Sequence, residues 1–219
     1  MVPAAMTTKA PKVDIPRPRV IDAAIDELFP GGDHEGQRFS DADLGDVDLT
    51  GSTFRDCEFA SVTLNETRMR GVRFLDSLMT ASFAPILRAP RSTWRDVLLE
   101  SPRWGSSELF DSELRGVHIR GGKIDYLNLR GSTLTDVLIE DCFITDLDLG
   151  GATTTRVALK NCRIDTIDLT RSTNRDLDLR GSDFAALNGL DGARGVTIDE
   201  GQLSLLAPLL ASHLGLIVE

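Results

Sequence analysis

Pairs of aspartates separated by one residue are the most obvious candidates for chemistry in this sequence. They occur at Asp41/Asp43, Asp46/Asp48, Asp146/Asp148 and Asp176/Asp178. Carboxylates at such a spacing can hold a divalent cation, for which oxygen atoms are the preferred ligands. Here the residue between the two aspartates belongs to a repeating series that is expected to point inward, so both carboxylates should face solvent on a flat wall. We therefore expect solvated repeat positions, and neither a metal nor another cofactor.

The nucleophilic and basic side chains do not form a recognisable catalytic set. The histidines, His34, His118 and His213, lie far apart in the sequence, and no Ser-His-Asp or Cys-His arrangement can be assembled from them. The cysteines occupy positions that are expected to be buried, which is typical of inert core thiols: Cys57, Cys142 and Cys162. The sequence therefore predicts a protein that is not an enzyme.

The composition limits the class of protein and of partner. The chain has 219 residues, a net charge of −10 and a pI near 4.8. This balance argues against the basic surface that direct nucleic-acid binding needs. The sequence has no run of eighteen apolar residues and no secretion signal at its start, and its three cysteines do not suggest a secreted disulfide framework. We expect a cytoplasmic protein with no membrane association.

A five-residue period positions all of these side chains. Of the 30 residues found at every fifth position from Phe39 to Phe184, 26 are Leu, Ile, Phe, Met or Trp, whereas ordinary composition would give about eight. We call these the large positions. Small residues dominate two places earlier, at what we call the small positions. A period of five fits neither a helix nor a simple strand.

A longer period of 20 residues indicates how these units stack. Leu127, Leu147, Ile167 and Leu187 form one such series. Four units per turn make a square coil in which equivalent residues stack about 4.8 Å apart. The 31 units between Gln37 and Asp191 then give about 7.75 coils and a rod of roughly 37 Å. In this register Cys142 and Cys162 are inward neighbours on adjacent coils, and we expect them to be free thiols because the cytoplasm is reducing.

Segments such as DADLGDVDLTGSTFRDCEF and DLDLRGSDF resemble the pentapeptide-repeat proteins. The resemblance implies an all-β solenoid, a right-handed quadrilateral parallel β-helix, here with a short α-helical C-terminal cap. It also implies a role in binding other proteins. Some members of that family bind DNA gyrase in place of duplex DNA and protect it from quinolones, and members often dimerise through their C-terminal end.

The sequence divides into four segments. Residues 1–20 predict a flexible tail, and residues 21–36 a short helix and turn leading into the solenoid. Residues 37–191 form the β-helix, and residues 192–219 the helical cap and dimer segment. The pattern fails at 77–91, where two alternatives remain open: three irregular units that stay in the coil, or an extruded loop.

The final segment carries more leucines than one coil end should need. Its leucines have helical spacing, and Pro208 is expected to begin a second short helix. Leu205, Leu209 and Leu210 are the candidate contacts of a homodimer, because an exposed apolar patch commonly marks an interface. The alternative is a monomer in which Leu216–Val218 folds back over the patch.

Two acidic patches are the candidate surfaces for a protein partner, one in 41–58 and one in 131–155. Their residues are Asp41, Asp43, Asp46, Asp48, Asp136, Glu140, Asp141, Asp146 and Asp148. One hypothesis is a DNA-mimicking binder of DNA gyrase that affects the action of topoisomerase-directed drugs. The alternative is a general protein-interaction scaffold unrelated to topoisomerases.

Overall fold

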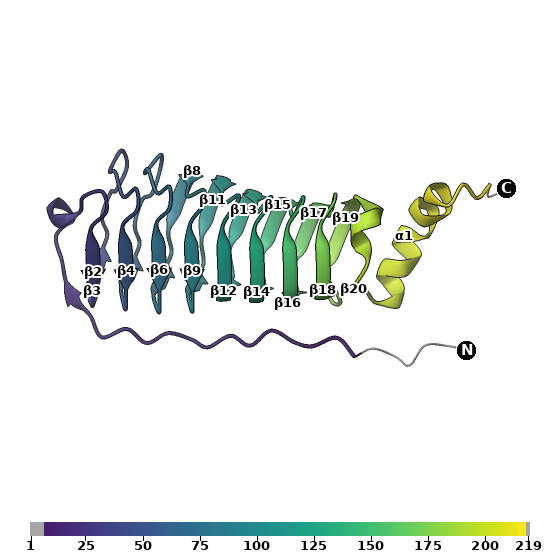
Figure 1. Ribbon diagram of the computed structural model, residues 1–219, viewed down its shortest axis with the longest axis horizontal. Helices are drawn as coiled ribbons and strands as arrows, with labels where there is room; N and C mark the ends of the chain where they lie inside the picture. Colours follow the sequence, from purple (N-terminus) through teal and green to yellow (C-terminus); the bar gives the residue numbers. More distant parts are fainter. Residues whose placement is uncertain (1–6, 218–219) are drawn as a thin grey trace.

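The computed structural model describes residues 7–217, in which the chain winds into a rod-shaped parallel β-solenoid of about nine turns (Figure 1). Strands on successive turns pair with partners 20 residues away, for example Phe59 with Met79 and Leu127 with Leu147. This register is the predicted 20-residue period. The predicted solenoid with a C-terminal helix is confirmed.

Two parallel sheets form the walls of the rod. The larger has 14 strands. Near the N-terminal end these are short: β1 (Ile21–Asp22), β2 (Asp33–Glu35), β3 (Gln37–Ser40), β4 (Thr53–Arg55), β5 (Glu58–Ala60), β6 (Arg73–Leu75), β7 (Leu78–Thr80), β9 (Thr93–Arg95) and β10 (Leu98–Glu100). The later ones are longer, apart from the last: β12 (Glu113–Arg120), β14 (Thr133–Glu140), β16 (Thr153–Lys160), β18 (Thr173–Asp178) and β20 (Val196–Thr197). The second sheet has six strands: β8 (Phe83–Arg88), β11 (Arg103–Glu108), β13 (Lys123–Asn128), β15 (Phe143–Asp148), β17 (Arg163–Asp168) and β19 (Asp183–Asn188).

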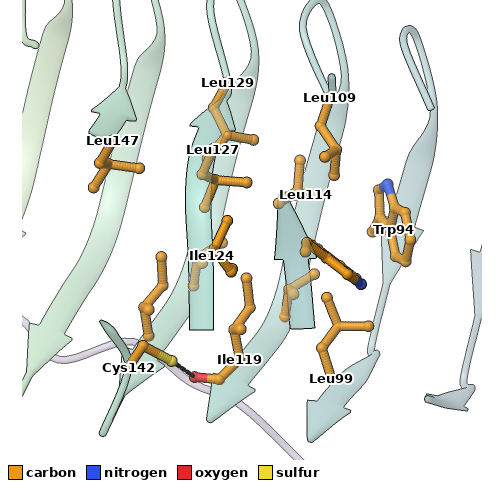
Figure 2. Close-up of a cluster of buried hydrophobic side chains, with 14 of the residues drawn as sticks. Trp94, Leu99, Leu109, Leu114, Ile119, Ile124, Leu127, Leu129, Cys142 and Leu147 are labelled. Carbon is orange, nitrogen blue, oxygen red and sulfur yellow. Dashed lines mark hydrogen bonds between the residues drawn. The ribbon is translucent and has the colours of Figure 1, made fainter. Parts of the chain in front are cut away.

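The core is the narrow space inside the coils, filled by the large and small positions. Figure 2 shows Leu109 and Leu129 on successive coils, with Leu127 and Leu147 stacked in a neighbouring series. The cysteines also lie inside, where all three are buried and free, and the Cys142 thiol donates to the Ile119 carbonyl at 3.8 Å. Burying such continuous apolar columns is what stabilises a solenoid whose repeats cannot fold alone.

The corners of the coil explain why aspartate and glycine recur two residues after the large positions. Asp56, Asp76 and Asp96 adopt left-handed backbone angles with φ of 50°, 50° and 53°, as do Gly51 and Gly71 with 72° and 68°. Glycine reaches this region without strain, and aspartate tolerates it better than most residues.

The irregular residues 77–91 stay in the coil, so the loop alternative is wrong. Ala84 pairs with Trp104 one coil later, and the indole N–H of Trp104 donates to the Ser82 hydroxyl at 3.1 Å. Ala84 and Ala89 are fully buried at their large positions. The small alanine leaves volume that the large indole of the next coil can fill, which keeps the core closed.

The first coil begins earlier than residue 37. The short helix expected in residues 21–36 is only a 3₁₀ turn at Ile25–Glu27, and β1 and β2 pair with the coil that follows. His34 occupies a large position and stacks on Phe54 at 4.9 Å between ring centroids. Its ring continues the apolar series at this end because its flat face packs like that of phenylalanine.

A single helix, α1 (Glu200–His213), closes the other end. Asp199 and Gln202 form a reciprocal capping box, and Gln202 donates to the carbonyls of Leu179 and Ser182 at 2.6 and 2.7 Å. These bonds satisfy acceptors of the last coil. The prediction that Pro208 begins a second helix is wrong, because α1 continues through Pro208. Pro208 lies on the exposed side of α1, where water can satisfy the carbonyl of Ser204.

The N-terminal segment is the largest departure from the sequence prediction. Residues 7–20 lie along the rod for most of its length rather than forming a flexible tail (Figure 1). The backbone N–H groups of Lys9 and Lys12 bond to aspartates of the solenoid, which provides a contact that composition alone does not reveal. The earlier part of the predicted tail, residues 1–6, lies outside the described residues. No helix between residues 7 and 217 is long and apolar enough to cross a bilayer.

Candidate interaction surfaces

The first predicted patch is an exposed acidic cluster near the N-terminal end of the rod. Asp41, Asp43 and Asp46 are all exposed. The carboxylate of Asp43 accepts from the Gly45 N–H at 2.9 Å, a local bond that fixes the turn and leaves the second oxygen available. These three side chains are free to meet a cationic surface.

Asp48, in the same patch, is more constrained. It accepts from the Thr50 N–H at 3.0 Å and pairs with Arg68, whose Nε lies 3.3 Å away. The hydrogen bonds from Thr50, assisted by Arg68, hold the pKa of Asp48 below its usual value. Asp48 therefore stays ionised, but Arg68 partly neutralises its negative charge.

The second predicted patch, in 131–155, does not form a continuous acidic surface. Arg156 donates two bonds of 2.6 Å to Asp136, and these bonds hold the pKa of Asp136 below its usual value. Glu140 bonds to the His118 ring at 2.7 Å. The sequence interval contains no base, but stacking at 20 residues brings Arg156 and His118 from adjacent coils onto these carboxylates.

Asp148 is not the solvated wall residue that the sequence predicts. It is 8% exposed and accepts from Arg130, from the Tyr126 hydroxyl at 3.1 Å and from the Gly150 N–H at 2.8 Å. It is a structural carboxylate because its charge is matched by Arg130 and its lone pairs are occupied.

Replacing Asp148 by alanine should therefore destabilise the protein by about 1–3 kcal/mol, because the buried Gly150 N–H and the Tyr126 hydroxyl lose their acceptor. Thermal unfolding measures this. The matched control is Asp146→Ala, an exposed neighbour whose loss should cost under about 0.5 kcal/mol. Equal stability of the two variants would contradict the structural role of Asp148.

The six-stranded sheet carries an acidic row that the sequence analysis missed in part. Asp125 on β13, Asp146 on β15 and Asp165 on β17 are all exposed on successive strands, with Asp146 one residue further along its strand because it pairs with Tyr126 and Thr166. Asp125 also lies 3.8 Å from the Lys123 ammonium group. Asp146 was predicted, whereas Asp125 and Asp165 were not. The signal was available, since Asp125 and Asp165 are two 20-residue periods apart. Asp141 is also exposed, at a corner with φ of 53°.

The predicted dimer contacts on α1 separate into two groups. Leu205 and Leu209 are 50% and 41% exposed, whereas Leu210 is half-buried and packs against the core. Leu206 is the apolar residue that α1 buries most deeply against the last coil. Leu205 and Leu209 are thus the side chains open to a partner. Val218, part of the alternative fold-back strand, lies outside the described residues.

Residues 38–74 match a family model described as pentapeptide repeats, in 8 copies. No curated protein matches the chain by sequence. One similar solved structure is full-length QnrB1, a plasmid-mediated fluoroquinolone resistance protein, with 17% identity, 84% of this chain and 96% of that chain covered, and a TM-score of 0.26. Another is HetL, a pentapeptide-repeat protein involved in heterocyst differentiation regulation in the cyanobacterium Nostoc sp. strain PCC 7120, with 14% identity, 77% and 87% covered, and a TM-score of 0.31.

Proposed function

This chain is a pentapeptide-repeat protein, and from that premise we propose that it is a non-enzymatic rod that binds another protein through exposed carboxylates. The observation that carries the proposal is the acidic row on the six-stranded sheet, formed by Asp125, Asp146 and Asp165. These side chains stand on rigid strands whose inward residues fill the core, so their spacing is fixed before a partner arrives. Such preorganisation lowers the entropic cost of binding.

We propose DNA gyrase as the partner, with the rod binding in place of duplex DNA. The resemblance to the gyrase-binding members of the family and the acidity of the chain support this. Residues 37–191 carry 25 acids and 19 bases, whereas duplex DNA of about 37 Å would hold roughly 22 charges. Mimicry must therefore come from local surfaces, and the acidic row and the Asp41–Asp46 cluster are two exposed surfaces of this kind.

A gyrase supercoiling assay tests this function. We expect the full chain to inhibit supercoiling at roughly micromolar concentration, within the usual affinity range of specific protein complexes. The triple variant Asp125→Asn, Asp146→Asn, Asp165→Asn should lose most of this inhibition. The control removes three exposed acids from the other sheet, Asp33→Asn, Glu35→Gln and Glu113→Gln, and should inhibit like the unaltered protein. No inhibition by the unaltered chain at about tens of micromolar would reject gyrase as the partner.

We also propose that the rod forms a symmetric homodimer through α1. Leu205 and Leu209 are exposed on α1, whereas Leu206 and Leu210 of the same helix pack against the coil end. A two-fold contact between such patches is the commonest way to bury them.

Analytical ultracentrifugation measures the dimer directly. The unaltered chain should sediment at twice 23.9 kDa, and Leu209→Glu should shift it to the monomer because a charge would be buried at the contact. A full-length chain that stays at 23.9 kDa at about tens of micromolar would contradict the dimer.

A further inference from the structure

Residues Thr7–Val20, which we call the strap, follow one corner of the rod (Figure 1). This corner, the corner column, consists of equivalent left-handed residues on successive coils. Its members are Gly36, Asp56, Asp76, Asp96, Gly116, Asp136, Arg156 and Asp176. The strap thus lies over a largely acidic line in the middle of the larger sheet.

The strap has a regular register with the coils. The Lys9 N–H donates to Asp176 at 3.1 Å, and the Lys12 N–H donates to Asp136 at 3.0 Å. Two coils span about 9.6 Å, and three extended residues span about 10 Å. Continued at three residues per two coils, this register brings Arg19 to Gly36, where the Arg19 carbonyl does lie close to the glycine. An extended chain therefore matches the spacing of the solenoid along its length.

The strap has two different sides. Its exposed residues are mostly charged, whereas Pro11, Val13 and Pro16 are half-buried. Beside the corner column, outward-pointing side chains of the larger sheet are almost completely covered: Leu98 is 2% and Leu138 8% exposed, although both lie beside a core residue and face away from it. The strap, whose backbone is bonded to Asp136 and Asp176 of this column, runs next to this apolar strip, which we call the groove.

The strap leaves one polar group of this groove without a partner. His118 stands between Leu98 and Leu138 in the same series and is 5% exposed. Its Nε2 bonds to Glu140, while its Nδ1 has no hydrogen-bond partner within residues 7–217. At this level the register places Val13, which has no polar side-chain atom. A buried nitrogen without a hydrogen-bond partner is unfavourable. The strap therefore occupies the groove without providing a hydrogen bond to His118 Nδ1.

One coil closer to the N-terminal end of the solenoid, the strap makes a second unfavourable contact. Burial and Asp76 raise the pKa of Asp96 of the corner column, Arg95 and Arg115 lower it, and Asp14 of the strap adds a smaller upward contribution. The charge of Asp14 is therefore unfavourable beside Asp96. The strap therefore combines a matching backbone with two unfavourable side-chain contacts.

We propose that this groove binds an extended, proline-containing peptide segment of a partner protein, and that the strap occupies it in the free protein as a displaceable stand-in. The partner segment supplies two backbone N–H groups three residues apart, for Asp136 and Asp176. It carries apolar side chains facing the groove, and a hydroxyl side chain at the position of Val13 to pair with His118. The proposal concerns a different wall from the acidic row and does not depend on gyrase.

Fluorescence anisotropy with labelled synthetic peptides tests the proposal on the full-length protein. One peptide has the sequence of residues 7–20, and the other carries Val13→Thr. The variant Lys9→Pro/Lys12→Pro removes the two donating N–H groups while remaining compatible with an extended backbone. It should release its own strap and bind the unmodified peptide at least about tenfold more tightly than the unaltered protein, whose tethered strap competes at high effective concentration. The threonine peptide should bind more tightly still, by about threefold or more.

Two controls separate the N–H groups from other effects. Ala10→Pro makes the same type of change at a residue whose N–H makes no bond to the described solenoid, and Lys9→Gln/Lys12→Gln removes the charges but keeps both N–H groups. Both should behave like the unaltered protein. Hydrogen exchange of residues 13–20 reports whether the strap has opened.

Three results would overturn the proposal. The strap of the double-proline variant could stay protected from exchange, which would mean that these N–H groups do not hold it. The opened groove could fail to bind either peptide. Energy transfer between differently labelled full-length copies could show that straps exchange between molecules, which would make a second copy the occupant instead of a partner.

Discussion

Replacing Leu149 or Ile164 by aspartate is expected to abolish the folded rod. Both side chains point into the coil and are almost fully buried. A carboxylate there would lose its water without gaining a base or a set of donors, a change at the severe end of what single substitutions do, on the order of 4–5 kcal/mol or more. Because each coil stacks on the next, the damage should not stay local. Circular dichroism should show loss of the β signal or a large fall in melting temperature.

The matched control for this prediction is Asp146→Asn, a change of an exposed residue on β15. It should leave the melting temperature within a few degrees of that of the unaltered protein. If the core variants and Asp146→Asn melted together, the assignment of inward and outward positions would be wrong.

Gly189→Ala is expected to have the second largest effect, at the junction between the last coil and the cap. Gly189 has φ of 75°, and a methyl group there would lie 2.3 Å from the backbone nitrogen of Thr170. Backbone atoms of the neighbouring coil cannot move aside without breaking ladder bonds. We expect a loss of several kcal/mol, about the cost of overpacking added to that of the left-handed conformation. Thermal unfolding and hydrogen exchange of α1 measure it.

Gly181→Ala isolates the contribution of the backbone angle. Gly181 also has φ of 75°, but nothing lies within 4 Å of the position that a methyl group would take. It should lose only about 1–2 kcal/mol, the cost of placing an alanine in the left-handed region. A Gly189→Ala protein no less stable than Gly181→Ala would show that the contact with Thr170 does not constrain the junction.

The repeat made most of the fold predictable. Phe59, Met79 and Leu99 are 20 residues apart in the sequence and stack on successive coils, because each coil places equivalent residues over one another. The inward positions of Cys142 and Cys162 follow from the same arithmetic. Repeat lengths of five and twenty residues were sufficient to predict the fold because each coil of a solenoid contacts only the coils next to it.

The interaction surfaces were less predictable because charges were counted along the sequence rather than across coils. Arg156 neutralises Asp136 from the next coil, and Arg130 pairs with Asp148 from the previous one. Both pairs are 18–20 residues apart, so an interval such as 131–155 cannot reveal them. Applying the 20-residue period to outward positions would have found the Arg156–Asp136 pair and the aspartates Asp125 and Asp165, whereas the Arg130–Asp148 pair is offset from that period by two residues.

The strap could not be predicted from the periodicity, because it lies outside the repeat. Its contacts are made by backbone N–H groups of Lys9 and Lys12, which every non-proline residue possesses. The strap is also rich in proline and basic residues, a composition that is common in unstructured termini. Only the three-dimensional line of aspartates on the corner column distinguishes the two cases.

If the exposed aspartates bind a protein partner in place of DNA, duplex DNA should compete with the rod for that partner, and a competition experiment measures this. Fluorescently labelled full-length protein is bound to purified gyrase, and duplex DNA is added. We expect DNA to displace the rod, and the variant Asp125→Asn, Asp146→Asn, Asp165→Asn to bind at least about tenfold more weakly because it has lost several complementary charges. Absence of binding, or binding that duplex DNA leaves unchanged, would contradict it.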